Sequence, residues 1–174
     1  MNARRRIVLL GAVALAATVA ACAAPKSLAG VPGGRPGWVL YRVGELWFRA
    51  PRDWHATGDV RHATVQEPDA RSKLEITVPE QPFPDQRACL AAAEERLSRA
   101  AAGLERARRH PTKLAGRPGL SMEADQGGWH VWAIAACDGG VQYQIFFTSA
   151  TPASTFAMDV WQQLVQDARI GGEA

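Results

Sequence analysis

The chain has 174 residues, with 20 Lys and Arg against 17 Asp and Glu and a formal net charge of +3. This length suits one domain preceded by a short leader. The first 21 residues hold three Arg and no acidic residue, so the remainder carries 17 charges of each sign. A neutral remainder offers no electrostatic basis for a nucleic-acid-binding protein, and we predict no nucleic-acid partner.

Residues 1–21 are predicted to be a secretory signal peptide. Three arginines at positions 4–6 precede an apolar run rich in Ala and Gly, and small residues follow. This order is typical of an export signal. The apolar run from Ile7 to Ala24 also reaches the lower limit of length for crossing a membrane. An uncleaved helical anchor is therefore the alternative interpretation.

The segment Val19-Ala20-Ala21-Cys22 resembles the lipobox of bacterial lipoproteins, in which one aliphatic and two small residues precede a cysteine. The resemblance implies cleavage just before Cys22 and a diacylglyceryl group on its thiol. It also implies acylation of the new amino group by a fatty acid such as palmitate. Two or three acyl chains make a stable membrane anchor.

The same resemblance predicts where the protein resides. We expect a domain anchored to membrane lipid through Cys22, in the cell envelope, facing the periplasm or the exterior. Ala23 follows the cysteine where an Asp would signal retention in the inner membrane. In a Gram-negative host this implies delivery to the outer membrane.

Residues 22–37 are predicted to be the lipidated cysteine and a flexible tether. After the cysteine they consist of small residues, Pro, Gly and basic residues, with one Leu and one Val. Such a composition cannot build a core. The folded domain is expected over residues 38–170.

Four strands are predicted in the first part of this domain. Two apolar, aromatic-rich segments flank a Gly44-Glu45 turn, which indicates a β-hairpin that ends at Pro51. In a later segment, Leu74 and Ile76 alternate with polar residues, the period of a strand with one buried face. The four segments are residues 38–43, 46–50, 60–67 and 72–80.

A helix, a loop, three strands and a last helix are predicted to follow. Asp85 is expected to cap a helix over residues 86–102, and Gly103 to end it. Thr151, followed by Pro152, is expected to cap a last helix that runs to about Ala168. The three strands are residues 119–124, 129–137 and 141–150.

In residues 129–137 the odd-numbered residues are largely apolar, and so are the even-numbered ones. Since the two sets point to opposite faces of a strand, this predicts a strand covered on both faces. Strands that follow one another in hairpins form antiparallel sheets. The predicted fold class is therefore α+β, with an antiparallel sheet of about six to eight strands flanked by two main helices.

Three segments resemble PsbP-like domains. "LWFRAPRDWHATG" resembles the family's opening, "KLAGRPGLSMEA" the turn after its first long helix, and "FAMDVWQQLVQDARI" its closing helix. These domains occur in the photosystem II extrinsic protein, in the Mog-type nuclear transport factor and in many bacterial lipoproteins of unknown role. The resemblance implies an antiparallel αβα sandwich over residues 38–170 that acts by binding.

No residue pattern indicates catalysis, a metal or a cofactor. The four histidines have no metal-site spacing to one another, to carboxylates or to cysteines. Asp53 and His55 are expected in a turn, and His130 as a partly buried, hydrogen-bonded side chain. Ser121 lies in a near miss of the nucleophile elbow, in which Glu123 replaces the second glycine. We predict a protein that is not an enzyme.

Two features leave alternatives open. Arg106, Arg108 and Arg109 form a basic cluster, which is either a partner surface for anionic headgroups or phosphorylated ligands or a charged edge strand that prevents aggregation. The six tryptophans either fill the core or line a groove.

Cys89 and Cys137 are predicted to form a disulfide. With Cys22 lipidated they are the only pair left in an exported chain. Cys89 lies in the first turn of the predicted helix, and Cys137 ends a strand on its Val131 side. A helix packed across that end of the sheet brings the Cα atoms within the roughly 4.4–6.8 Å that a bridge requires. Two buried, unpaired cysteines are the alternative.

The predicted function is that of a membrane-anchored envelope lipoprotein, a non-catalytic binding or assembly accessory for an unknown protein partner. The first alternative is a carrier of a small hydrophobic ligand, which predicts a pocket lined by Trp and Phe. An enzyme is the less favoured alternative, because it needs a cleft with convergent polar groups that the sequence does not indicate.

Overall fold

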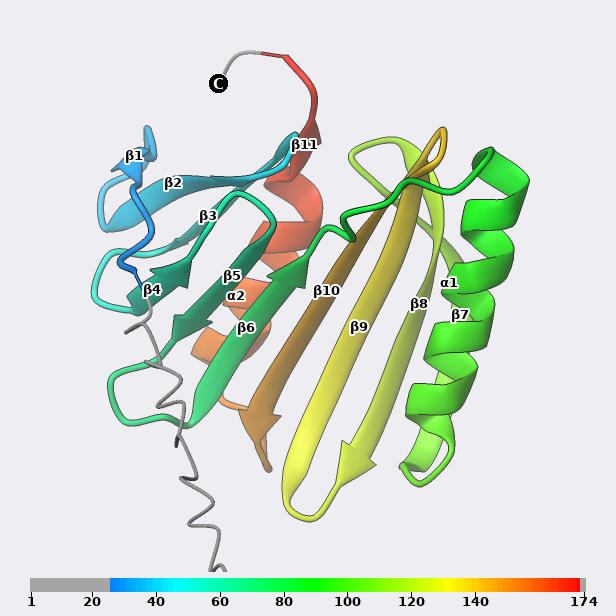
Figure 1. Cartoon of the computed structure of the whole chain (residues 1–174). Coiled ribbons are helices and arrows are strands. Elements are labelled where there is room, and N and C mark those ends of the chain that lie inside the picture. The colour runs from blue at the N-terminus through cyan, green and yellow to red at the C-terminus, as the bar shows by residue number, and fades with distance from the viewer. Residues whose placement is uncertain (1–25, 173–174) are drawn as a thin grey trace, which may run out of the picture.

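The computed structural model describes residues 26–172 (Figure 1). In this part the chain forms two helices, α1 (Gln86–Ala101) and α2 (Thr155–Asp167). The strands of a small sheet are β1 (Val31–Pro32), β2 (Trp38–Val43), β3 (Leu46–Pro51) and β11 (Arg169–Ile170). Those of a large sheet are β4 (His55–Gly58), β5 (His62–Gln66), β6 (Ser72–Thr77), β7 (Glu105–Leu114), β8 (Arg117–Gln126), β9 (Trp129–Asp138) and β10 (Val141–Ala150).

Both sheets are antiparallel. The large sheet has seven strands in the order β4-β5-β6-β10-β9-β8-β7, and the small sheet has four in the order β1-β2-β3-β11. This confirms the predicted α+β class, the size of the antiparallel sheet and the two main helices. The predicted hairpin is also present, with Val43 paired to Leu46. Its strands β2 and β3, however, form a second sheet and do not join the first.

The second sheet exists because one face of the hairpin is apolar. Val43, Leu46, Phe48 and Ala50 are fully buried. They pack, together with Val160 and Leu164 of α2 and other side chains, against one face of the large sheet. Burial of these side chains drives the two layers together. Figure 1 shows α2 behind the large sheet and α1 in front of it.

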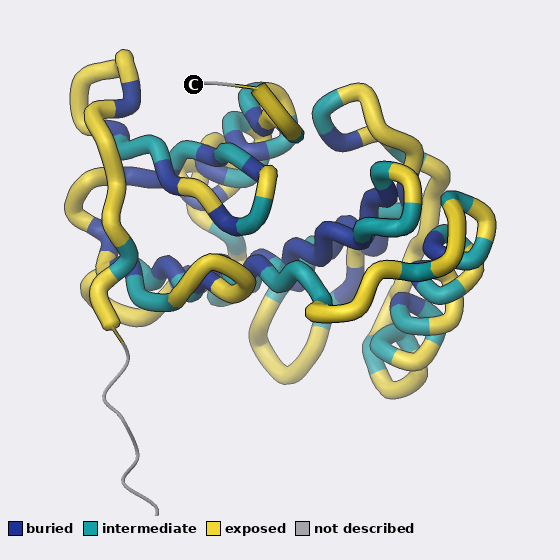
Figure 2. The backbone as a smooth tube through the Cα atoms, turned by 45° about the horizontal axis from the view of Figure 1, so that its top comes forward, coloured by how far each residue is buried: buried dark blue, intermediate teal, exposed yellow. Residues whose placement is uncertain are grey.

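The other face of the large sheet is covered by α1. Ala93 and Leu97 pack on Met122, Val131, Ala133 and Ala135. The neighbouring side chains of β9, among them Ile134 and Ala136, point to the α2 side and belong to the main core. Strand β9 is therefore covered on both faces, as its sequence predicted. The buried parts of the chain run through the middle of the molecule between these layers (Figure 2).

The prediction of a flexible tether over residues 22–37 is wrong from Lys26 onward, where the chain is bonded to the two sheets. The Leu28 amide donates to the Ala56 carbonyl at 3.1 Å, and the Gly58 amide donates to the Lys26 carbonyl at 2.9 Å. Strand β1 then pairs with β2. These backbone bonds do not depend on apolar side chains, so the composition did not reveal them. The signal peptide and Cys22 lie outside the described residues.

Two strands lie where other structure was predicted. Strand β4 occupies part of the segment in which His55 was expected to lie in a turn. Strand β7 replaces the loop expected after α1, although its basic residues had also suggested an edge strand. As the edge of the large sheet, it is exposed over most of its length and has no alternating apolar residues to reveal it. Within residues 26–172, no helix is long and apolar enough to cross a membrane.

Helix α1 begins as predicted. Asp85 is its N-cap and accepts a hydrogen bond from the Ala88 amide at 2.8 Å. Helix α2 begins later than predicted, because Ser154 and not Thr151 accepts the capping bond from the Ala157 amide at 3.0 Å. The backbone of Thr151 instead donates to the Gly128 carbonyl, which ties the segment before the helix to the β8–β9 turn.

The position of this cap gives a stability prediction. Ser154→Ala removes the side-chain acceptor and is expected to lower the free energy of unfolding by about 1 kcal/mol. Thr151→Ala removes a side chain with no capping bond and should change it little. Urea unfolding of both variants, followed by circular dichroism, measures the difference. A larger loss for Thr151→Ala would contradict the cap assignment.

Candidate functional site

Cys89 and Cys137 are joined by a disulfide whose Cα atoms lie 6.1 Å apart. The bond connects the first turn of α1 to the end of β9, as the sequence predicted. Both residues are fully buried. Disulfides of this kind persist in oxidising compartments and are rare in a reducing cytoplasm. The bond therefore agrees with an exported chain.

A buried polar network continues from this disulfide beneath α1. The side chain of Gln142 donates through Nε2 to the Cys89 carbonyl at 3.2 Å. The side chain of Gln144 donates through Nε2 to Oε1 of Gln142. Arg96 of α1 donates to Gln144 at 2.8 Å. Each bond satisfies a polar group that burial would otherwise penalise. The network therefore attaches the helix to the sheet, and only Arg96 Nε among these side-chain atoms is buried without a hydrogen-bond partner.

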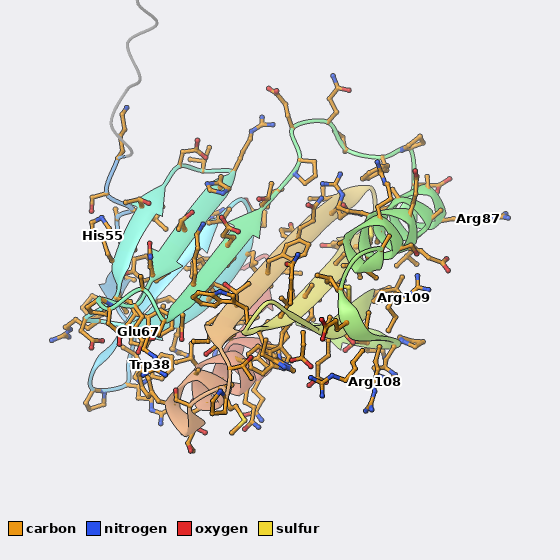
Figure 3. All side chains as sticks on the ribbon, turned by 90° about the horizontal axis from the view of Figure 1, so that it is seen from below. Trp38, His55, Glu67, Arg87, Arg108 and Arg109 are labelled. Atoms are coloured by element: carbon orange, nitrogen blue, oxygen red, sulfur yellow. A yellow bond between two sulfur atoms is a disulfide. The ribbon has the colours of Figure 1, made fainter. Side chains whose placement is uncertain are left out.

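The basic cluster, for which a partner surface and a charged edge strand were the two interpretations, lies on the edge strand β7 and is divided between the two faces of the large sheet. In β7, Arg109 pairs with Met122 and contacts Ser98 of α1, whereas Arg108 pairs with Glu123 and faces away from α1. Figure 3 shows Arg109 beside α1 and Arg108 farther from it. Neighbouring residues of a strand point to opposite faces. The three arginines therefore do not form a single surface.

On the face away from α1, charged side chains form a small ion-pair cluster. His130 contacts Asp125 through Nδ1 at 2.7 Å and Glu123 through Nε2 at 3.0 Å. Arg106 contacts the other oxygen of Asp125 at 2.9 Å. With Arg108 these groups surround a hollow of only about 180 Å³. Its charges largely neutralise one another.

The polar surroundings of His130 are carboxylates and arginines. Both ring nitrogens of His130 face carboxylates, and no hydroxyl or thiol contacts the ring among the described residues. No group of three or more His, Cys, Asp or Glu in residues 26–172 is placed to hold a metal ion. The sequence had predicted His130 as a partly buried, hydrogen-bonded residue, which is how it lies.

Most of the tryptophans lie in the core or at its edge. Trp54, Trp132 and Trp161 each stack on Phe147, with ring centroids 5.6–6.2 Å apart. The His130 ring packs on Trp132 at the end of this aromatic group. Trp129 is the most exposed, at the start of β9. One hollow of about 400 Å³ beside α2 is lined by Trp38 and Phe156. Its other lining residues are all polar or charged, namely Arg35, Asp159, Gln162, Gln163 and Gln166, so it lacks the apolar lining that suits a hydrophobic ligand.

Another hollow of the described chain is a groove of about 850 Å³. Its walls come from segments far apart in the sequence, and neither Trp nor Phe lines it. The apolar lining residues are Leu28, Ala29, Val60, Val78, Pro79, Pro82 and Val141. The charged residues around it are Lys26, Arg42, Glu45, Asp59, Arg61 and Glu80.

Hydrogen bonds hold the walls of the groove in place. The Gly44 amide donates to the Val60 carbonyl at 2.6 Å, and the Val78 amide donates to the Arg61 carbonyl at 2.8 Å. These bonds connect the β2–β3 turn, the β4–β5 turn and the segment after β6, which meet at one end of the molecule (Figure 1). The lining is therefore preformed.

The charges at the groove are mostly paired. Arg42 contacts Glu45, and Arg61 contacts Glu80 at 3.7 Å. Asp59 accepts backbone hydrogen bonds from Arg61 at 2.7 Å and His62 at 2.9 Å. These bonds lower the pKa of Asp59 below its ordinary value, so this carboxylate is charged at neutral pH. An apolar floor with a charged rim is suited to binding.

Sequence reasoning did not identify this groove. Its apolar residues are isolated Leu, Val, Pro and Ala, most of them in turns and connections, where no period reveals a shared surface. The one available signal was the run "TVPEQPFP", in which one valine and three prolines follow a strand. That run has too few polar residues for an ordinary solvent-exposed loop.

Comparison with solved structures shows similarity over most of the chain. The solution structure of cyanobacterial PsbP from Synechocystis sp. PCC 6803 superposes with a TM-score of 0.57 and 11% identity. The alignment covers 83% of this chain and 99% of that chain. The fold is that of PsbP. The resemblance seen in the sequence is thereby confirmed at the level of the fold.

A second similar structure is a crystal structure of a protein from Bacteroides thetaiotaomicron, with a TM-score of 0.52 and 10% identity. The alignment covers 86% of this chain and 50% of that chain. Neither a scan against protein families nor a search of curated proteins gives a match. At these identities the similarity establishes the fold, and function has to be argued from the site.

Proposed function

We propose that the protein is a membrane-anchored envelope lipoprotein that acts as a non-catalytic binding or assembly accessory. Cys22 is its lipid attachment point, and the PsbP fold is the part that meets the partner. The lipobox-like segment and the buried disulfide support residence outside the cytoplasm.

The observation that carries the binding role is the preformed groove. Ligand sites are concave and mostly apolar, with a few polar groups that orient the ligand. The groove has this character, and it is open along its length rather than enclosed. An open groove with valines and prolines on its floor suits an extended segment of a protein better than a compact small molecule. Its paired rim charges are available for hydrogen bonds to such a segment.

A site-specific photo-crosslinker in the native cell tests this role. Glu80 lies on the groove rim with its side chain 83% exposed, and Glu95 lies on α1 with its side chain 68% exposed. Each glutamate contacts one arginine loosely, at 3.7 Å and 3.6 Å, so the two positions are matched. A benzophenone amino acid at position 80 is expected to capture one defined protein, and the same group at position 95 is not.

A blocking substitution separates groove binding from chance proximity. Ala29 is exposed and lines the groove. Ala29→Arg is expected to abolish the adduct at position 80 without changing the amount of folded protein. An adduct that survives this substitution, or that forms equally from position 95, would refute the groove as the binding site. A small hydrophobic molecule that copurifies with the protein and is lost in Ala29→Arg would favour the carrier alternative.

A further inference from the structure

The N-terminal segment leaves the fold at one defined place, the free edge of β4. Ser27 forms a β-bridge with Thr57, and the neighbouring amide of Gly58 donates to the Lys26 carbonyl at 2.9 Å. The Leu28 amide donates to Ala56 on the other side of the bridge. The point from which the chain runs back toward Cys22 is thus fixed beside the end of β4.

The chain between this point and the proposed anchor is short. Only three residues separate Cys22 from Lys26. At about 3.5 Å per residue, the two Cα atoms are at most about 14 Å apart. A domain of this size has a radius of gyration of about 15 Å. If Cys22 is lipidated as we propose above, the domain cannot extend away from the bilayer on a long tether, and the region around Lys26 has to lie against it.

We infer that the β4–β5 turn, residues 59–61, lies in the headgroup region of the membrane, with Val60 as its apolar contact. The turn follows Gly58, which bonds directly to Lys26. Val60 is 74% exposed, the most exposed large apolar residue of the described chain. An exposed apolar side chain is costly in water and is stabilised at the boundary between headgroups and acyl chains.

The turn is rigid enough to present this side chain. Asp59 accepts hydrogen bonds from the amides of Arg61 and His62, and the Val60 carbonyl accepts one from Gly44. Lys26 and Arg61 add positive charges that anionic lipids attract. Asp59 and Glu80, which contacts Arg61 at 3.7 Å, are the opposing charges. They limit the contact to the headgroup region and keep the turn out of the hydrocarbon. The binding groove shares these residues, so its occupant would lie at the membrane surface.

A single-cysteine label tests this orientation. With Cys22 acylated and Cys89 bridged to Cys137, Val60→Cys supplies the one free thiol for an environment-sensitive fluorophore. The lipidated protein is reconstituted in vesicles of phosphatidylethanolamine and phosphatidylglycerol, with and without spin-labelled quencher lipids. Arg108→Cys in β7 is the control, because the large sheet places β4 and β7 at opposite edges.

The label at position 60 is expected to shift its emission to the blue and to be quenched several-fold more strongly than the label at position 108. Ten Gly and Ser residues inserted before Lys26 should weaken that quenching. Equal quenching at both positions, or none at position 60 while the protein remains on the vesicles, would overturn the inference. A protein that fails to float with the vesicles would instead contradict the proposed lipid anchor.

Discussion

Replacement of both bridged cysteines, Cys89→Ala with Cys137→Ala, is expected to lower the free energy of unfolding by about 4 kcal/mol. The bond spans 48 positions of sequence, and the loop that it closes restricts the unfolded chain. It also connects α1 to the large sheet. The helix buries few large side chains against that sheet, and the largest of those that are fully buried is Leu97. Urea unfolding measures the loss.

The unsubstituted protein supplies the control for this prediction. Reduction of its disulfide should shift the urea midpoint by nearly the same amount as the double substitution. Thiol titration of the unfolded, unreduced mature protein should find no free thiol. Two free thiols, or a midpoint that neither treatment changes, would show that the bond does not form.

The second large effect is expected in the aromatic core. Phe147 is fully buried and stacks on three tryptophans from separate elements, so Phe147→Ala should lower the free energy of unfolding by about 3–5 kcal/mol. Phe156→Ala is the matched control, because that ring is 45% exposed and contacts only the edge of the group. Its loss should be less than half as large. Comparable losses for the two variants would contradict the packing described above.

The elements that could be predicted from the sequence are those whose own side chains carry the signal. Leu74 and Ile76 alternate with polar residues, and Asp85 provides a capping carboxylate just before the apolar stripe of α1. Both features follow from local geometry and from burial against a single neighbouring layer. The disulfide could be predicted because the chain has only three cysteines and Cys22 was expected to carry lipid, which left two partners.

The elements and the groove that the sequence did not predict depend on contacts between segments that are distant in the sequence. Strand β1 and the Lys26–Leu28 segment are held by backbone hydrogen bonds to β2 and β4, and no side-chain pattern records such bonds. The groove likewise combines valines from separate turns. For Arg108 and Arg109 a signal was available: once residues 105–114 are assigned to a strand, alternation sends the two side chains to opposite faces.

Mass spectrometry of the N-terminal peptide, taken from the native protein in its own cells, tests the proposed lipid anchor most directly. The account predicts a mature chain that begins at Cys22, with residues 1–21 removed and with the mass of a diacylglyceryl group on its thiol. A Cys22→Ser variant should accumulate as the unprocessed precursor. A native chain that retains Met1, or one whose Cys22 carries no lipid, would contradict the account.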